Sequence, residues 1–141
     1  MEDTTDAHPP VQPYGVIIAD NDPDVRAGLR LLLARQRHFR VVGECTSADE
    51  LYRDAAAVGP DLILLDLELR GLRVMEHLGQ LREACPRTAI IALSTRGEQR
   101  PVAVGAGASA FLCKNESPAL LMPMLDAVAR QLRTLPGEQP A

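Results

Sequence analysis

Short runs of consecutive apolar residues alternate along the chain with longer segments in which apolar residues recur at helical spacing. The run at 61–66 reads Asp-Leu-Ile-Leu-Leu-Asp, and four adjacent aliphatic residues are typical of a strand buried on both faces of a parallel sheet. Further strands are predicted at 16–19, 40–45, 88–93 and 110–113. Residues 40–45 alternate only weakly and suit the edge of the sheet.

Between these strands, apolar residues recur every three or four positions, which predicts a helix in each interval. Asp22 followed by Pro23 opens the first helix, and Ser47 with Glu50 forms a capping box for the second. The third is expected over 72–84. The residues expected to face the core are Val25, Leu29, Leu32 and Leu33; Leu51, Ala55 and Val58; Met75, Leu78, Leu81 and Cys85; and Leu121, Leu125, Val128 and Leu132.

Proline and glycine limit the last two helices. The interval 96–107 is rich in glycine and contains Pro101, so only a short helix of about 101–106 is expected there. Ser117 as the cap and Pro118 in the first turn predict the start of the last helix. Pro123 lies too deep for that first turn, and we expect it to bend the helix or to delay its start to about Met122.

Five strands alternating with five helices require parallel strands joined by right-handed crossovers. The predicted fold is therefore a five-stranded, doubly wound α/β fold of the flavodoxin type. We expect one domain over 14–133. Residues 1–13 are polar and proline-containing, as in disordered segments, and 134–141 form a short polar tail.

Composition narrows the classes of function. A net charge of −4 argues against a nucleic-acid surface. No apolar run is long enough to span a membrane, and no signal sequence is evident, so a cytoplasmic location is expected. The three cysteines and three histidines lack metal-ligand or disulfide spacing, and Cys45 and Cys113 are expected to act as small apolar residues in strands.

Polar residues follow four of the predicted strands, where a parallel sheet usually binds its ligands. They are Asp20-Asn21-Asp22, Asp66, Ser94 or Thr95, and Lys114. Clustered carboxylates favour a hard cation such as Mg²⁺, and a carboxylate can attack phosphorus to form an aspartyl phosphate. A lysine and a hydroxyl can bind phosphoryl oxygens. The set therefore supports phosphoryl acceptance.

This arrangement, with Phe111 three residues before Lys114, resembles the receiver domain of bacterial two-component response regulators over about 14–133. The segments 41–44 and 105–118 look most like receivers joined to helix-turn-helix DNA-binding domains. The resemblance implies a regulatory, non-enzymatic domain that takes a phosphoryl group from a histidine kinase or a small phosphodonor. It also implies dimerisation through the last helix and strand, and no membrane or direct nucleic-acid binding by this chain.

The resemblance further implies a role for each matching residue. Asp66 would be the phosphoacceptor, Lys114 the lysine that binds the phosphoryl group, and Ser94 the switch hydroxyl, with Phe111 the aromatic that reports its position. The implied Mg²⁺ ligands are Asp20, Asn21, Asp66 and the backbone carbonyl of Glu68.

Three positions depart from the family pattern. Asn21 stands where a second acid is usual, Arg70 where a proline is common, and Val74 where a glycine is common. The amide of Asn21 carries no charge, whereas a carboxylate would attract the cation. One unit charge at about 4 Å contributes roughly 4 kcal/mol of attraction at an effective dielectric near 20, before desolvation offsets part of it. The resemblance thus implies Mg²⁺ binding that is weakened by Asn21, and Asp22 could compensate only by giving up its cap.

Two other functions are compatible with the residues. An atypical receiver could act as an interaction or ligand-binding module without phosphorylation. A small phosphatase of another parallel-sheet class would use Glu68 as its second acid, but a strand-two hydroxyl and a cap domain are missing. Simpler roles also stay open: Asp66 or Asp20 could order a loop, Ser94 could bond its own loop with Thr95 as its rival, Phe111 could be ordinary core, and Lys114 a surface lysine.

Overall fold

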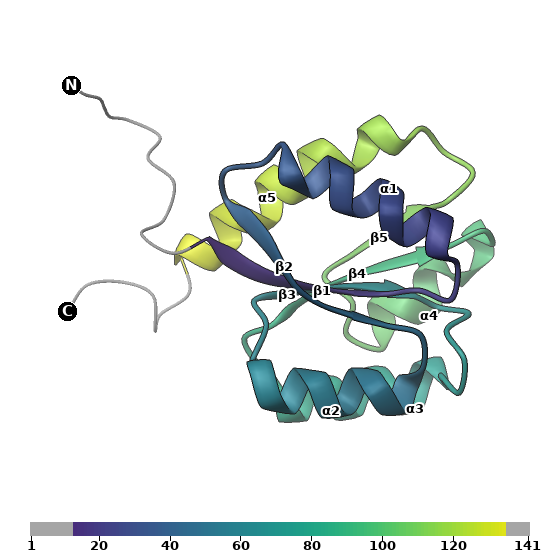
Figure 1. Ribbon diagram of the computed structural model, residues 1–141. Coiled ribbons are helices and arrows are strands. Elements are labelled where there is room, and N and C mark those ends of the chain that lie inside the picture. The colour runs from purple at the N-terminus through teal and green to yellow at the C-terminus, as the bar shows by residue number, and fades with distance from the viewer. Residues whose placement is uncertain (1–12, 135–141) are drawn as a thin grey trace, which may run out of the picture.

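One parallel sheet forms the centre of the protein in the computed structural model, which describes residues 13–134 (Figure 1). Its strand order is β2-β1-β3-β4-β5, and every pairing is parallel. The strands are β1 (Tyr14–Ala19), β2 (Phe39–Cys45), β3 (Leu62–Asp66), β4 (Ala89–Ser94) and β5 (Ala110–Cys113). The predicted doubly wound fold is confirmed, with β2 at an edge and β3 in the middle.

Helices cover both faces of the sheet (Figure 1). The helices α1 (Pro23–Ala34) and α5 (Leu121–Thr134) lie on one face, and α2 (Ala48–Val58), α3 (Val74–Ala84) and α4 (Arg100–Gly105) lie on the other. Along β3, Leu62 and Leu64 belong to the core under α1 and α5, whereas Ile63 and Leu65 belong to the opposite core. This alternation explains the unbroken apolar run, because both faces of the strand are buried.

The predicted helix starts are confirmed at two positions. The Asp22 carboxylate accepts a hydrogen bond of 2.9 Å from the Asp24 N–H. The Ser47 hydroxyl accepts one of 3.2 Å from the Glu50 N–H, and the Glu50 carboxylate accepts one of 2.7 Å from the Thr46 N–H. Each cap satisfies backbone donors that have no partner inside the helix.

The two proline-limited helices agree with their prediction. The interval after β4 holds a 3₁₀ turn, η1 (Gly97–Gln99), and the short α4. Before α5, a second 3₁₀ turn, η2 (Pro118–Leu120), uses Ser117 as its cap. The α-helix proper then begins at Leu121, so Pro123 falls in its first turn, where a missing N–H costs little. The predicted inner residues Leu121, Leu125, Val128 and Leu132 are all buried.

Three details of the helix prediction are wrong. Val58 is 47% exposed and Met75 is 65% exposed, although both were expected in the core. Val58 is the last residue of α2, and the left-handed Gly59 (φ 62°) ends the helix directly after it. The helix α3 begins at Val74 instead of residue 72, and Val74 packs against the core in place of Met75.

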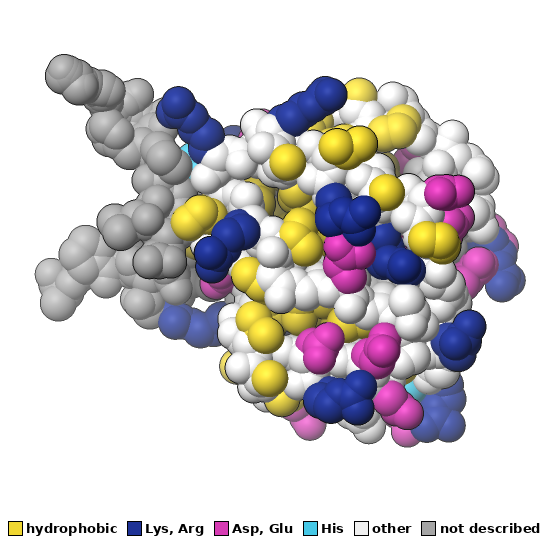
Figure 2. Space-filling model, viewed as in Figure 1, with side chains coloured by type: hydrophobic (Ala, Val, Ile, Leu, Met, Phe, Trp, Pro, Cys, Tyr) yellow, Lys and Arg dark blue, Asp and Glu magenta, His cyan; other side chains and the backbone are white. Residues whose placement is uncertain are grey.

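The predicted disordered lead-in and C-terminal tail lie outside the described residues, apart from Pro13 and Thr134. Within residues 13–134, none of the helices has the length and apolar character needed to cross a membrane. Figure 2 shows acidic and basic side chains interspersed on one face of the molecule, without a continuous basic surface there.

Candidate functional site at the carboxyl edge of the sheet

Two acids and one lysine converge at the carboxyl ends of the strands. Asp20 follows β1, Asp66 ends β3 and Lys114 follows β5. The Lys114 Nζ lies 2.8 Å from Asp20 Oδ2 and 3.4 Å from Asp66 Oδ1. The side chains of Asp20 and Asp66 are only 1% and 6% exposed, whereas that of Lys114 is 21% exposed. The parallel topology therefore brings together three of the predicted site residues.

Asp66 and Lys114 each influence the pKa of the other. Burial raises the pKa of Asp66, and the nearby charge of Asp20 raises it further, against the opposing effects of the Glu68 N–H and of Lys114. Burial alone would lower the pKa of Lys114, but the hydrogen bond to Asp20 and the charges of both acids outweigh it and raise the pKa. Lys114 is therefore a firmly protonated cation between two acids, and a plain surface lysine is excluded.

The loop after β3 is joined to the loop after β1 through Asn21. The Asn21 Nδ2 donates a hydrogen bond of 2.7 Å to the backbone carbonyl of Glu68. The Asn21 Oδ1 accepts one of 3.1 Å from the Arg70 N–H. Asp22 is exposed and keeps its role as helix cap, so it does not join the acid pair.

The switch candidates Ser94 and Phe111 are buried, at 0% and 1% exposed. The Ser94 hydroxyl donates to Gln99 Oε1 and accepts a hydrogen bond of 3.0 Å from the Arg96 N–H. Its hydrogen bonds thus engage the loop before α4. Its rival Thr95 is exposed. Arg100 lies over the Phe111 ring, 4.9 Å from the ring centre, and donates to the Phe111 carbonyl.

Gln99 and Arg100 are functional candidates that sequence reasoning missed. Both lie in the segment 97–105 between β4 and β5, where the glycine content and Pro101 indicated only a short helix. The one available signal was a long polar side chain five residues after Ser94, which is within reach of that hydroxyl when a 3₁₀ turn intervenes.

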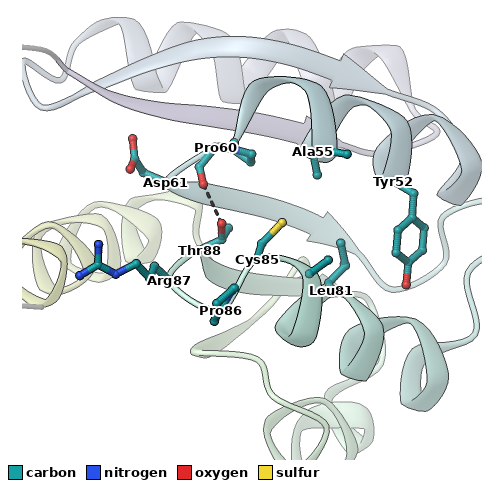
Figure 3. A pocket seen from close by; sticks show the side chains of 12 residues that line it. Tyr52, Ala55, Pro60, Asp61, Leu81, Cys85, Pro86, Arg87 and Thr88 are labelled. Carbon is teal, nitrogen blue, oxygen red and sulfur yellow. Dashed lines mark hydrogen bonds between the residues drawn. The ribbon is translucent and has the colours of Figure 1, made fainter. Parts of the chain in front are cut away.

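A groove of about 560 Å³ lies between α2 and α3 (Figure 3). Asp61 and Thr88, at the amino ends of β3 and β4, line it, so it lies at the opposite end of the sheet from Asp66. The Thr88 hydroxyl donates to the Pro60 carbonyl at 2.7 Å, as the dashed line in Figure 3 marks. The Thr88 hydroxyl therefore connects the segments that precede β3 and β4.

The cysteines show two environments. Cys45 is fully buried, and burial with a hydrogen bond to Asp54 raises the pKa of its thiol to about 12. Its thiol therefore stays protonated, and its burial agrees with the small buried residue expected there. Cys113 in β5 is only partly buried, and so is Cys85 in the groove. His77 accepts a hydrogen bond of 2.7 Å from the Arg73 N–H, and His8 lies outside the described residues.

The fold and this edge define a class: an α/β protein with buried acids and a lysine grouped where an anionic group can be bound. Comparison with known proteins gives the family. The family model for the response regulator receiver domain matches residues 16–126. The chain belongs to this family, the receiver domains of two-component response regulators, which is a regulatory family.

Individual relatives agree with the family. The nitrate/nitrite response regulator protein NarL of Escherichia coli is 31% identical over 120 residues, covering 84% of this chain and 56% of NarL. The uncharacterized transcriptional regulatory protein YhcZ of Bacillus subtilis is 34% identical over 109 residues, covering 76% of this chain and 51% of YhcZ. The chain thus spans about half the length of these curated relatives.

Solved structures share the fold. A two-component response regulator of the LuxR family from Aurantimonas superposes with a TM-score of 0.77 at 29% identity, over 85% of this chain and 87% of that one. The receiver domain of AraT from Geobacillus stearothermophilus has a TM-score of 0.77 at 20% identity, over 86% of this chain and 97% of that one.

Receiver domains generally bind Mg²⁺ at the acidic edge of the sheet, which raises the question whether these residues fit the ion. Mg²⁺ needs oxygen ligands in octahedral geometry. Here the Glu68 carbonyl accepts from Asn21 Nδ2, and Asn21 Oδ1 accepts from Arg70 N–H. The oxygens of Asn21 and Glu68, two of the four expected ligands, are thus already engaged in hydrogen bonds between the two loops. The residues as arranged therefore do not fit the ion.

Proposed function

We propose that this receiver domain accepts a phosphoryl group on Asp66 and thereby changes its affinity for a partner. The observation that carries the proposal is the position of Asp66: at the end of the central strand, nearly buried, with the Lys114 Nζ 3.4 Å from its Oδ1. Oδ1 also accepts from the Glu68 N–H at 2.9 Å. Among the hydrogen bonds of residues 13–134 none engages Oδ2, so Oδ2 is the oxygen left to attack.

The proposed step is transfer from an acyl phosphate or from the phosphohistidine of a histidine kinase. A lone pair of Asp66 Oδ2 forms the new P–O bond while the bond from phosphorus to the donor's oxygen or nitrogen breaks, and that donor atom leaves with the bonding electrons. Lys114 is the more exposed partner, so its ammonium meets the incoming anion first and neutralises a phosphoryl oxygen.

Ser94 and Phe111 are proposed to carry the signal away from Asp66. To reach the new phosphoryl group, the Ser94 hydroxyl must leave Gln99. That movement would loosen the segment that carries Arg100, which covers Phe111. Val102 and Val104 of α4 are exposed, and α4 packs against β5, the last strand, which belongs to the face expected to dimerise.

Several finer points belong to this proposal and not to the established family membership. They are a histidine kinase or small phosphodonor as partner, a cytoplasmic location, Mg²⁺ binding that is weakened by Asn21, and a DNA-binding output segment as the downstream element. A phosphorylation-independent interaction module is less favoured, because such a module has no need for the close approach of Asp20, Asp66 and Lys114.

The test is incubation with a small acyl phosphate, with and without Mg²⁺, followed by intact-mass spectrometry. Wild type should gain the mass of one phosphoryl group and Asp66→Asn should gain none. The proposal fails if wild type stays unmodified under conditions that modify another receiver domain, or if Asp66→Asn is modified equally.

A further inference from the structure

Two positions that depart from the family pattern meet in space. Asn21, in the loop after β1, bonds to two backbone groups of the loop after β3: its Nδ2 donates to the Glu68 carbonyl at 2.7 Å and its Oδ1 accepts from the Arg70 N–H at 3.1 Å. Residues 21 and 70 are thus joined directly. A single amide side chain bridges the loop that follows Asp66.

The chemistry of this bridge is specific to the residues present. With the amide rotated by half a turn, an oxygen would face the Glu68 carbonyl and an NH₂ would face the Arg70 N–H, so only one orientation satisfies both contacts. An aspartate at position 21 could accept from Arg70, but it would set a carboxylate oxygen against the Glu68 carbonyl. A proline at position 70 would have no N–H to donate. The bridge therefore needs an amide at position 21 and a residue other than proline at position 70.

The other side of the same loop is fixed as well. The Arg70 carbonyl accepts a hydrogen bond of 2.8 Å from the Ala48 N–H at the start of α2, and the Leu67 N–H donates to the Leu93 carbonyl of β4 at 2.9 Å. Asn21 supplies the connection to the loop after β1, so the loop is held from three neighbouring segments of the edge. No ion is needed between Asn21 and Glu68, since the amide hydrogens already carry the positive end of a dipole to the carbonyl.

We propose that Asn21 is a positioning residue that latches the loop after the phosphoacceptor in the arrangement described here, without a cation. The latch does at the Glu68 carbonyl what a metal ion would otherwise do, while Lys114 neutralises Asp20 and Asp66. Mg²⁺ could reach the Glu68 carbonyl only by opening the hydrogen bonds of Asn21. Because Asn21 is exposed, water can replace these bonds, and the latch is reversible.

This inference rests on the edge site of the proposed function, but its test does not depend on phosphorylation. The thermal unfolding midpoint would be measured in excess EDTA and in millimolar Mg²⁺ for wild type, Asn21→Asp and Asn115→Asp. Asn115 is the matched control, because its exposed amide also donates to a backbone carbonyl, that of Thr95, at 3.1 Å. It receives the same change of charge outside the latch.

The expected result is a wild-type midpoint that hardly responds to Mg²⁺. Asn21→Asp should unfold at a lower temperature in EDTA and recover in Mg²⁺, with an affinity for the ion about tenfold or more above that of wild type, since a charged ligand replaces the latch. Asn115→Asp should respond to Mg²⁺ as wild type does. Equal Mg²⁺ responses of wild type and Asn21→Asp, or unchanged stability of Asn21→Asp in EDTA, would refute the latch.

A second measurement covers the case in which Asn21→Asp does not fold. In a Mg²⁺ titration of wild type followed by NMR, the side-chain NH₂ of Asn21 and the Arg70 amide should keep their shifts through the millimolar range. Movement of both signals at low Mg²⁺ would contradict the latch. The two proposals fail separately: a missing phosphoryl adduct refutes the phosphoacceptor, whereas the Mg²⁺ responses decide only the latch.

Discussion

The central strand β3 is flanked by an aspartate at each end, and the two carboxylates have different surroundings. Asp61, just before the strand, is half-buried and accepts a hydrogen bond of 2.8 Å from the Gly15 N–H. Asp66, at the other end, is nearly buried and faces a second acid and a lysine. A carboxylate bound to a neutral backbone group holds segments together, whereas one that faces other charges is, in the proposed function, the group that reacts.

The basic side chains near the two ends of the sheet differ in the same way as the two aspartates. Arg82 of α3 donates to the backbone carbonyls of Thr88 and Pro86, at the amino end of β4. Lys114 instead binds the side chains of Asp20 and Asp66. One cation completes the hydrogen bonding of a turn, and the other balances charges that a phosphoryl group would change. Acidic and basic side chains therefore have structural roles at one end of the sheet, and the proposed function gives those at the other end a chemical role.

The largest effect is expected from removing the two cations. Lys114→Met should abolish nearly all phosphoryl transfer, because it removes the group that binds the incoming anion. It should also destabilise the fold by about 1–3 kcal/mol, since two buried acids lose their partner and part of that loss is relieved by solvent. Arg82→Met should cost about 1–2 kcal/mol through lost hydrogen bonds but leave phosphoryl transfer unchanged.

Intact mass after acyl phosphate treatment and urea unfolding measure the two effects of the cation variants. Comparable stability losses with opposite results for phosphoryl transfer would sharpen the contrast between the ends of the sheet. If Arg82→Met lost the adduct as completely as Lys114→Met, the contrast would be broken, because the two cations would then have the same role.

A smaller effect is expected from Gln99, which holds the Ser94 hydroxyl. Gln99→Ala removes one hydrogen bond that competes with the phosphoryl group for Ser94. A net hydrogen bond contributes about 1 kcal/mol, so the phosphorylated share at limiting donor should rise by up to roughly fivefold. The share can be read by intact mass over a series of donor concentrations.

Gln80 on α3 offers a matched control for the Gln99 variant. Its Oε1 also accepts from a hydroxyl, that of Tyr52, at 2.7 Å, but it lies away from the charged edge. Gln80→Ala should leave the phosphorylated share unchanged. A rise in both variants, or in neither, would show that the contact between Ser94 and Gln99 does not restrain the hydroxyl.

The sequence predicted the acids and the lysine because only strand order was needed to bring them together. Parallel strands end at one edge, so Asp20, Asp66 and Lys114 had to converge once the strands were correctly identified. Hydrogen bonds between loops were not predictable in this way. The contacts of Asn21 with Arg70 and of Ser94 with Gln99 depend on the backbone path of loops, which no periodic pattern encodes.

The burial of residues at helix ends was the second feature that the sequence did not predict. Spacing at three and four residues identified Leu51 and Ala55, as well as Leu78 and Leu81, which lie over the sheet. The same spacing extended to Val58 and Met75, which lie in the terminal turns and are exposed. Periodicity gives the face of a helix but not how far the sheet continues beneath it.

The smallest effect, and the most direct test of the two aspartates, is expected from neutralising each carboxylate in turn. The pKa of Asp66 is raised above its ordinary 3.8 by burial and by Asp20, so the folded protein holds this proton more tightly than the unfolded chain does. The contribution of Asp66 to stability is therefore most favourable below pH 3.8 and is lost as pH rises through the folded pKa.

Asp66→Asn removes that loss, so at pH 7 it should unfold at higher urea than wild type, and the gain should disappear near pH 3. Asp61→Asn keeps an acceptor for the Gly15 N–H but loses its charge, which should cost up to about 1 kcal/mol at pH 7. Opposite signs at neutral pH are thus expected for the same substitution at the two ends of one strand. If Asp66→Asn were less stable than wild type at pH 7, the attraction of Lys114 for the Asp66 charge would outweigh the cost of burying that charge. The two aspartates would then not differ in the sign of their effect on stability.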